Sequence, residues 1–183
     1  MQIADAQRQV RQTYRGGLAG QLVSGVLWAG SAAIGTWGSH RLAAIVLVLS
    51  GFLIFPLTVA ALRLAGRRAL GMLDNPLNAL AMQVAFTVPF VLPVVLTLAY
   101  YSPNRFFPAI LMVVGAHYLP FVFLYGMRMW WFLAGLMLGT GYVLGWVKPM
   151  GFATGGWVGA LLLVVFAFIG WRVVIGEERR TAS

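Results

Sequence analysis

Six long apolar runs, separated by short polar turns, make up most of this sequence. They occupy residues 17–39, 42–66, 77–101, 106–127, 129–147 and 155–175. An α-helix rises about 1.5 Å per residue, so a run of about 20 apolar residues can cross the hydrocarbon core of a bilayer. The pattern predicts an all-α fold, a polytopic transmembrane helical bundle of six spans.

The composition argues against a water-soluble globular domain. Of the 183 residues, 61% are hydrophobic and 9% are charged, whereas soluble domains carry about 25% charged residues. The sequence has no cysteine, which excludes disulfides and thiolate chemistry. The net charge of +9 comes mostly from basic residues that flank the apolar runs, as expected beside anionic lipid. We therefore expect the lipid bilayer as a partner, and no nucleic acid.

The basic residues also predict an orientation. We place the N-terminus, the 67–74 loop, the turn at 128 and the C-terminus on one side of the membrane. That side then has more basic residues than the other, and the positive-inside rule places it in the cytoplasm. Its basic residues are Arg8, Arg11, Arg15, Arg63, Arg67, Arg68, Arg128, Arg172, Arg179 and Arg180, against Arg41, Arg105 and Lys148 on the other side. The prediction is N-in/C-in, with an N-terminal interfacial or cytoplasmic segment (1–15), a transmembrane domain (16–176) and a cytoplasmic tail (177–183). Trp130 and Trp131 fall at predicted inner ends, in positions typical of an interfacial aromatic belt.

Acidic residues are rare and lie outside the predicted spans. The four are Asp5, Asp74, Glu177 and Glu178. Proton- and cation-coupled carriers commonly place a carboxylate within the membrane, and acid–base catalysis commonly uses positioned carboxylates. We therefore expect no enzyme activity, no catalytic residues, no metal and no cofactor.

His117 is the one ionisable side chain near the middle of a predicted span. Such a residue faces the bundle interior or a cavity, because charge in hydrocarbon is costly. If the turn near residue 103 forms a hairpin, Thr87 lies at the depth of His117. The ligand-binding candidates at this depth are Gln83, Thr87, His117, Tyr118 and Tyr125. The same residues could instead be hydrogen-bonding contacts between two packed helices.

Four prolines interrupt the predicted spans and are candidates for helix kinks. Proline removes one helical hydrogen bond and clashes with the carbonyl four residues earlier. A carbonyl freed in this way can serve a ligand or a neighbouring hydroxyl, although a simple packing kink explains the pattern equally well. The candidates are Pro56, Pro89, Pro93 and Pro120.

A weak internal repeat is present at an offset of 64 residues. Arg41, Gly51 and Pro56 align with Arg105, Gly115 and Pro120, so both segments read Arg-x9-Gly-x4-Pro. The third predicted hairpin does not follow the pattern. Either the bundle is built from duplicated helical hairpins or the matches are chance.

Three sequence pieces together resemble a known family. They are Gly-Phe-Leu-Ile-Phe-Pro-Leu at 51–57, Asn-Pro-Leu at 75–77, and Gly-Ala-His-Tyr-Leu-Pro at 115–120 followed by Leu124 and Tyr125. Their order and spacing resemble an uncharacterised family of small six-span bacterial integral membrane proteins, a domain of unknown function. The resemblance implies a multi-pass protein of the bacterial inner (plasma) membrane and brings no activity with it.

Two functions remain open. The polar residues at mid-depth and the kinked helices favour binding or transport of a small solute or ion through a mid-membrane site, alone or with a membrane-protein partner. The short turns and the absence of acids from the spans also suit a non-catalytic interaction or regulatory membrane protein, with a packed bundle and no ligand.

Overall fold

The computed structural model describes residues 1–66 and 75–182, and every regular element in them is helical. Three shorter helical turns accompany the α-helices: Arg15–Gly17 (η1), Pro103–Arg105 (η2) and the π-helical Val143–Val147 (η3). The α-helices are α1 (Ile3–Tyr14), α2 (Leu18–Trp37), α3 (His40–Gly51), α4 (Ile54–Leu64), α5 (Asn78–Tyr101), α6 (Phe106–Tyr118), α7 (Phe121–Tyr125), α8 (Met129–Tyr142) and α9 (Thr154–Ala182).

Four helical stretches are long and apolar enough to cross a bilayer. They are Ile3–Trp37, Asn78–Tyr101, Met129–Val147 and Thr154–Arg180. The pair α3 and α4 passes the same criteria together and is bent by 58°, so it would be a fifth span if it crosses as one unit. The fold is therefore all-α, with several helices suited to a membrane.

Two of the predicted runs form broken helices. Run 42–66 is split between α3 and α4 at Phe52 and Leu53, and run 106–127 is split between α6 and α7 at Leu119 and Pro120. A proline accompanies each break: Pro56 lies in the first turn of α4 and Pro120 directly precedes α7. Because proline cannot donate its backbone nitrogen and crowds the preceding turn, each run forms two helices instead of one.

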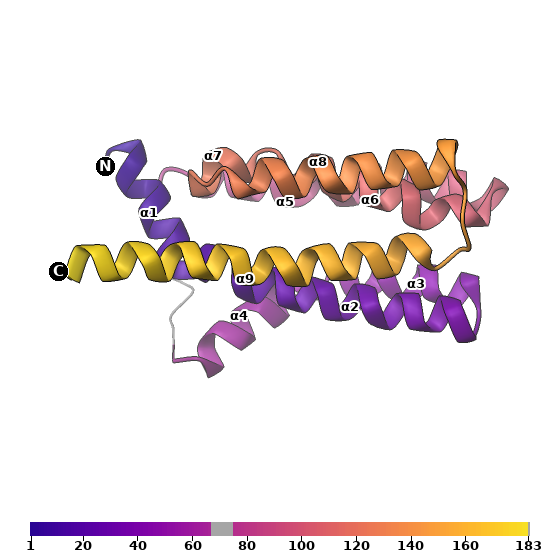
Figure 1. The fold of residues 1–183 in the computed structure, drawn as a ribbon, viewed down its shortest axis with the longest axis horizontal. Helices are drawn as coiled ribbons and strands as arrows, with labels where there is room; N and C mark the ends of the chain where they lie inside the picture. The colour runs from indigo at the N-terminus through magenta and orange to yellow at the C-terminus, as the bar shows by residue number, and fades with distance from the viewer. Residues whose placement is uncertain (67–74, 183) are drawn as a thin grey trace.

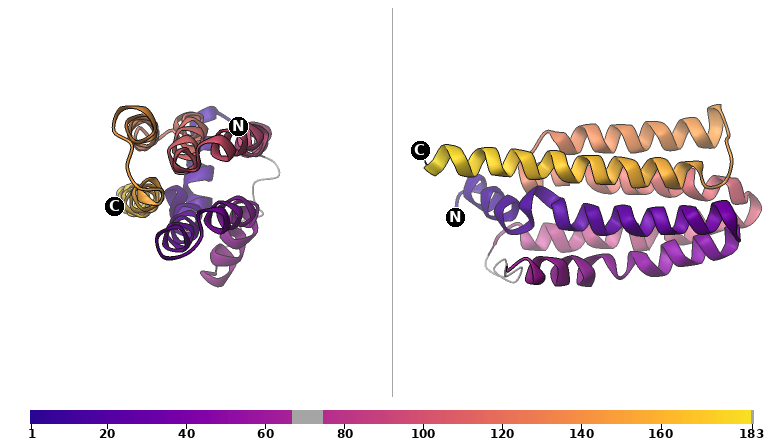
Figure 2. Two further views of the ribbon diagram at one scale, coloured as in Figure 1. Left: turned by 90° about the vertical axis from the view of Figure 1, so that its right-hand side faces the viewer. Right: turned by 60° about the horizontal axis from the view of Figure 1, so that its bottom comes forward.

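The helices run along one long axis of the molecule (Figures 1 and 2). α2 packs along α9 and also contacts α3. In the same way, α6 packs along α8 and also contacts α5. α8 and α9 also contact each other and join the two groups. The core between them contains large side chains with almost no exposure, among them Phe106, Phe107, Leu111, Leu133 and Met137.

Glycines allow the closest helix contacts. A Cβ at Gly141 of α8 would lie 2.6 Å from the carbonyl oxygen of Pro108 on α6, and one at Gly155 of α9 would lie 2.9 Å from Cβ of Phe107. Gly135 and Gly139, also on α8, face open space instead. Close internal packing therefore explains only some of the glycines that the sequence spaces four residues apart.

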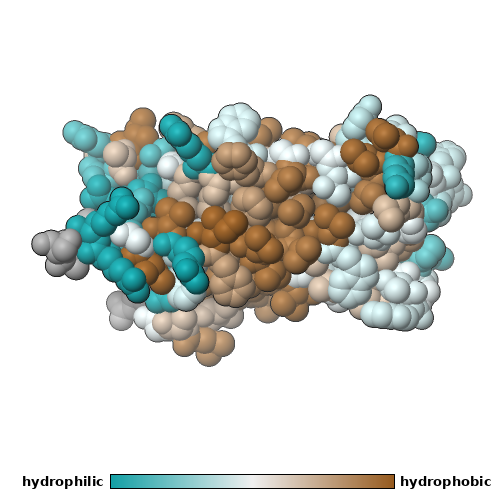
Figure 3. Space-filling model, viewed as in Figure 1, coloured by the Kyte–Doolittle hydropathy of each residue, from teal (hydrophilic) through white to brown (hydrophobic). Residues whose placement is uncertain are grey.

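A hydrophobic belt crosses the middle of one face of the molecule. Figure 3 shows apolar residues across the central part of one face, with hydrophilic residues toward both ends. Exposed large side chains in this belt include Leu161, Val165 and Phe168 of α9. An apolar surface of this kind suits lipid contact better than contact with water.

The N-terminal helix α1 docks against the end of the bundle. Ala6 and Val10 are 0% and 3% exposed, so one face of α1 is buried. Arg15, Gly16 and Gly17 have φ values of 48°, 66° and 93°, and this left-handed turn redirects the chain from α1 into α2. At the turn, the backbone of Gly16 is in direct contact with that of Gly170 on α9.

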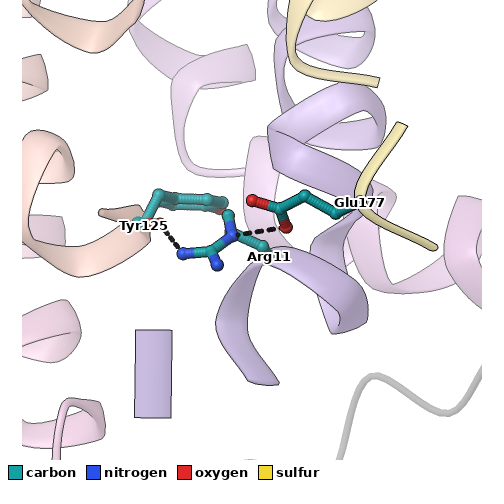
Figure 4. Close-up of polar contacts among 3 residues, drawn as sticks. All are labelled: Arg11, Tyr125 and Glu177. Atoms are coloured by element: carbon teal, nitrogen blue, oxygen red, sulfur yellow. Dashed lines mark hydrogen bonds and ion pairs between the residues drawn. The ribbon is translucent and has the colours of Figure 1, made fainter. Parts of the chain in front are cut away.

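Side chains of α1 bind the carbonyls at the end of α7. Gln7 Nε2 donates to the carbonyl oxygen of Phe123 at 2.6 Å, and Arg11 Nη1 donates to that of Tyr125 at 2.7 Å. Arg11 Nε also lies 3.0 Å from a carboxylate oxygen of Glu177 on α9 (Figure 4). The last carbonyls of a helix have no partner within it, and α1 supplies donors for two of them.

Asn75 ties the start of α5 to the same helix. Its Nδ2 donates to the carbonyl oxygen of Ala6 at 3.1 Å and to Oε1 of Gln9 at 2.7 Å, while its Oδ1 accepts from the Leu77 N–H at 2.9 Å. The predicted inner-side residues Arg67, Arg68 and Asp74 lie outside the described part of the chain.

Candidate functional site

Thr87 and His117 meet where α5 packs on α6. Thr87 Oγ1 lies 2.9 Å from Nδ1 of His117 and donates to the carbonyl oxygen of Val84 at 2.7 Å. A hydroxyl carries a single proton, so if Oγ1 donates to Val84 it can only accept a hydrogen bond from Nδ1–H of His117. That assignment makes Nε2 the unprotonated nitrogen of a neutral imidazole, a hydrogen-bond acceptor.

This pair lies at the edge of the bundle. The Thr87 side chain is exposed and His117 is partly buried. A small molecule would therefore reach the pair from the side, along the surface formed by α5 and α6, without passing through the core.

Two aromatic rings lie next to His117, and two more pack behind them. Its ring centroid lies 5.6 Å from that of Tyr118 and 5.2 Å from that of Phe121. Trp130 of α8 completes the cluster, with its centroid 5.3 Å from Tyr118, 5.0 Å from Phe121 and 4.9 Å from Tyr125. Ring pairs at these separations attract one another beyond simple area burial. We call Tyr118, Phe121, Tyr125 and Trp130 the aromatic wall.

The five predicted ligand-binding residues do not line one pocket. Thr87 touches His117, while Tyr118 and Tyr125, each 7% exposed, belong to the buried aromatic wall. Gln83 is exposed on α5, one helical turn before Thr87. The structure thus brings Thr87, His117 and Tyr118 together and leaves Gln83 at the surface.

Two hollows of the described chain lie away from Thr87 and His117. One of about 480 Å³ is an open groove on α5, and one of about 160 Å³ lies between η1 and the end of α9. The first is lined by Pro93, Val94, Thr97, Leu98 and Tyr101, and the second by Arg15, Trp171, Val174, Ile175 and Glu178.

The four proline candidates behave in two ways. Pro56 and Pro120 accompany helix breaks, whereas Pro89 and Pro93 lie within α5, which runs from Asn78 to Tyr101. The Pro93 carbonyl accepts a hydrogen bond from the Thr97 hydroxyl at 2.8 Å. The Ala116 carbonyl, four residues before Pro120, accepts from the Leu119 N–H at 3.1 Å. That carbonyl is therefore used within its own chain segment.

Sequence reasoning missed two buried polar groups. Gln21 of α2 is 2% exposed and Trp130 is 1% exposed, and neither the Gln21 amide nor Trp130 Nε1 has a hydrogen-bond partner among the described residues. The prediction that Trp130 belongs to the interfacial belt is wrong, because its ring packs inside the bundle, whereas Trp131 is 58% exposed. A glutamine inside an apolar run, on the same helix face as Gly17 and Trp28, was the signal in the sequence.

The described acids are on other helices than Thr87 and His117. Asp5 is on α1, and Glu177 and Glu178 are near the end of α9. Among residues 1–66 and 75–182, no group of three or more His, Cys, Asp or Glu side chains is placed to hold a metal ion. The groups near His117 that can act chemically are hydroxyls and aromatic rings, which suit hydrogen bonding and stacking.

Comparison with known proteins agrees with the resemblance seen in the sequence. No curated protein and no solved structure matches this chain. One family model matches residues 3–173, which is most of the chain. The chain therefore belongs to DUF7010, a family of unknown function.

Proposed function

We propose that this protein is a six-span protein of the bacterial inner membrane, with both termini in the cytoplasm, that binds a small solute at Thr87 and His117. Six spans follow if the bent pair α3–α4 and the broken pair α6–α7 each cross once, beside the four long helical stretches. The chain from Phe106 to Tyr125 has the length that one crossing needs. The bacterial location rests on the resemblance of the sequence to bacterial membrane proteins.

The distribution of charge supports the orientation. The two termini lie at the same end of the bundle (Figure 1). Among described residues, that end carries Arg8, Arg11, Arg15, Arg63, Arg128, Arg172, Arg179 and Arg180, while Arg41, Arg105 and Lys148 are at the other end. Basic residues concentrate on the cytoplasmic side of membrane proteins.

The contact between Thr87 and His117 carries the binding proposal. It holds an imidazole in one tautomer, beside aromatic rings and at a place that a ligand can reach. Nε2 of that imidazole accepts a hydrogen bond, so the favoured solute is small, offers an N–H or O–H donor, and has an apolar part that can stack on a ring. The proposal concerns binding and includes no catalytic step.

Ligand-dependent thermal stability tests this proposal. A solute that binds only the folded protein raises its unfolding temperature by mass action. We would screen purified protein in detergent against small N–H and O–H donors, then repeat each positive result with Thr87→Val and His117→Ala. Thr97→Val is the matched control, because Thr97 also lies on α5 and its hydroxyl also bonds a backbone carbonyl. We expect stabilisation to persist in the control, weaken in Thr87→Val and disappear in His117→Ala. Equal stabilisation of all four proteins would reject the site.

The aromatic wall supports a second function, a non-catalytic interaction or regulatory membrane protein with a packed bundle. Its rings occupy the space next to His117, and Trp130 is almost completely buried. In that case no solute stabilises the protein, and His117→Ala lowers the unfolding temperature through lost packing alone.

A further inference from the structure

Gln21 and Trp130 place three polar atoms in the core, and both side chains lie next to Gly17. Gln21 Nε2 and Oε1 and Trp130 Nε1 are buried and find no hydrogen-bond partner among the described residues. Gln21 is on α2 and Trp130 is on α8, so the atoms come from two different groups of helices.

Gly17 shows how closely the two side chains approach. A Cβ at this position would lie 2.9 Å from Cζ2 of Trp130, a ring carbon two bonds from Nε1, and 3.6 Å from Oε1 of Gln21. Gly17 has a φ of 93° and lies one turn before Gln21. The absence of a side chain at Gly17 lets the indole and the amide lie beside the same stretch of backbone.

Leaving these atoms unpaired would be costly. A buried amide without a hydrogen bond loses its solvation and gains nothing in exchange. More than nine in ten buried polar groups in proteins have a partner, and ordered water supplies it where the chain does not. No residue of 1–66 or 75–182 supplies that partner, and ordered water is the common alternative.

We propose that Gln21 and Trp130 bind an internal water molecule. The amide offers donors and an acceptor and the indole offers one donor, which complement the two lone pairs and two protons of water. The guest must be small, because Gln21 and Trp130 are 2% and 1% exposed and lie among packed helices. This site is separate from the proposed solute site, since neither Gln21 nor Trp130 Nε1 takes part in the contact between Thr87 and His117.

The bound water links parts of the bundle that have little direct contact. α2 packs mainly on α9, α3 and α4, whereas α8 packs mainly on α6 and α9. A water bonded to both Gln21 and Trp130 joins α2 to α8 and favours one register between them. Polar contacts between membrane helices contribute to association in this way.

Nuclear magnetic resonance tests the water directly. In ¹⁵N-labelled full-length protein in perdeuterated detergent, the Trp130 indole N–H signal is assigned by its loss in Trp130→Phe, or by its shift in Gln21→Met if the first variant does not fold. We expect a cross-relaxation peak between this N–H and a water resonance. A Trp130 signal without that peak overturns the proposal.

The sign of a stability change provides an independent test. Gln21→Met keeps the length of the side chain and removes both polar ends. If water is bound, the substitution leaves the water and Trp130 Nε1 underbonded, and the unfolding temperature falls by a few degrees. If the amide is unpaired, removing it relieves a burial cost and the unfolding temperature rises, which contradicts the proposal. Gln83→Met, at an exposed position on α5, is the matched control and should show no fall.

Discussion

Two glycines on α8, two residues apart, have opposite surroundings. A Cβ at Gly141 would be 2.6 Å from both Met112 Cγ and the Pro108 carbonyl oxygen, while Gly139 has open space at the corresponding position. We expect Gly141→Ala to lower stability by about 1–3 kcal/mol, because the backbone of α6 must move. We expect Gly139→Ala to be neutral or to stabilise by up to about 1 kcal/mol, because alanine favours the helix. Thermal unfolding of the two variants in the same detergent measures the difference. Equal losses would mean that α6 and α8 do not pack as described.

The contact between two consecutive helices was the predictable part of the candidate site. The hairpin between α5 and α6 requires that residues at equal distance from its turn face one another, and Thr87 and His117 lie 2.9 Å apart on that basis. Gln21 and Trp130, by contrast, are on α2 and α8 and both lie beside Gly17. No periodicity in the sequence reports which distant helices are neighbours, so this pair required the three-dimensional structure.

At the scale of elements, α1 is held to the bundle through Arg11. This side chain is 12% exposed and bonds both the end of α7 and Glu177 on α9. We expect Arg11→Gln to destabilise the protein by about 1–3 kcal/mol, since a charge-assisted bond is lost and a buried carbonyl loses its donor. Arg8→Gln is the matched control, because Arg8 is exposed on the same helix.

Cysteine labelling reports the docking of α1 separately from overall stability. The chain has no native cysteine and Ala6 is 0% exposed, so a thiol reagent should modify Ala6→Cys slowly. Arg11→Gln should accelerate that reaction under conditions in which the rest of the protein stays folded. An unchanged labelling rate would show that other contacts are sufficient to hold α1.

The elements illustrate what apolar runs can and cannot predict. Runs 77–101 and 129–147 coincide with α5 and with α8 plus η3, because uninterrupted apolar sequence of this length has few alternatives to a helix. The 58° bend between α3 and α4 depends on which backbone hydrogen bonds form around Phe52 and Leu53. An apolar run does not specify those bonds. The two copies of the Arg-x9-Gly-x4-Pro repeat also pack differently. Gly51 of the first copy faces open space, whereas Gly115 of the second packs against α8.

For the whole molecule, the orientation can be tested with single cysteines. Arg41, Arg105 and Lys148 lie at the end opposite the termini and are expected outside, whereas Arg128 and Arg179 are expected in the cytoplasm. A membrane-impermeant thiol reagent added to intact cells should modify the first three as cysteines and spare the other two. Permeabilised cells provide the control for reactivity. Labelling of Arg179→Cys in intact cells, with protection of Lys148→Cys, would reverse the proposed orientation.

The pairing of α2 with α9 bears on the order in which the protein is made. α2 precedes α9 in the chain by more than a hundred residues and is made well before it, yet the two pack so closely that a Cβ at Gly25 would lie 2.8 Å from Val164 Cγ2. Until α9 arrives, the face of α2 that carries Gln21, Ser24 and Gly25 lacks its principal neighbour within the chain. We therefore expect the growing chain to pass through an open intermediate, with lipid or the insertion machinery covering that face, until α9 has been made.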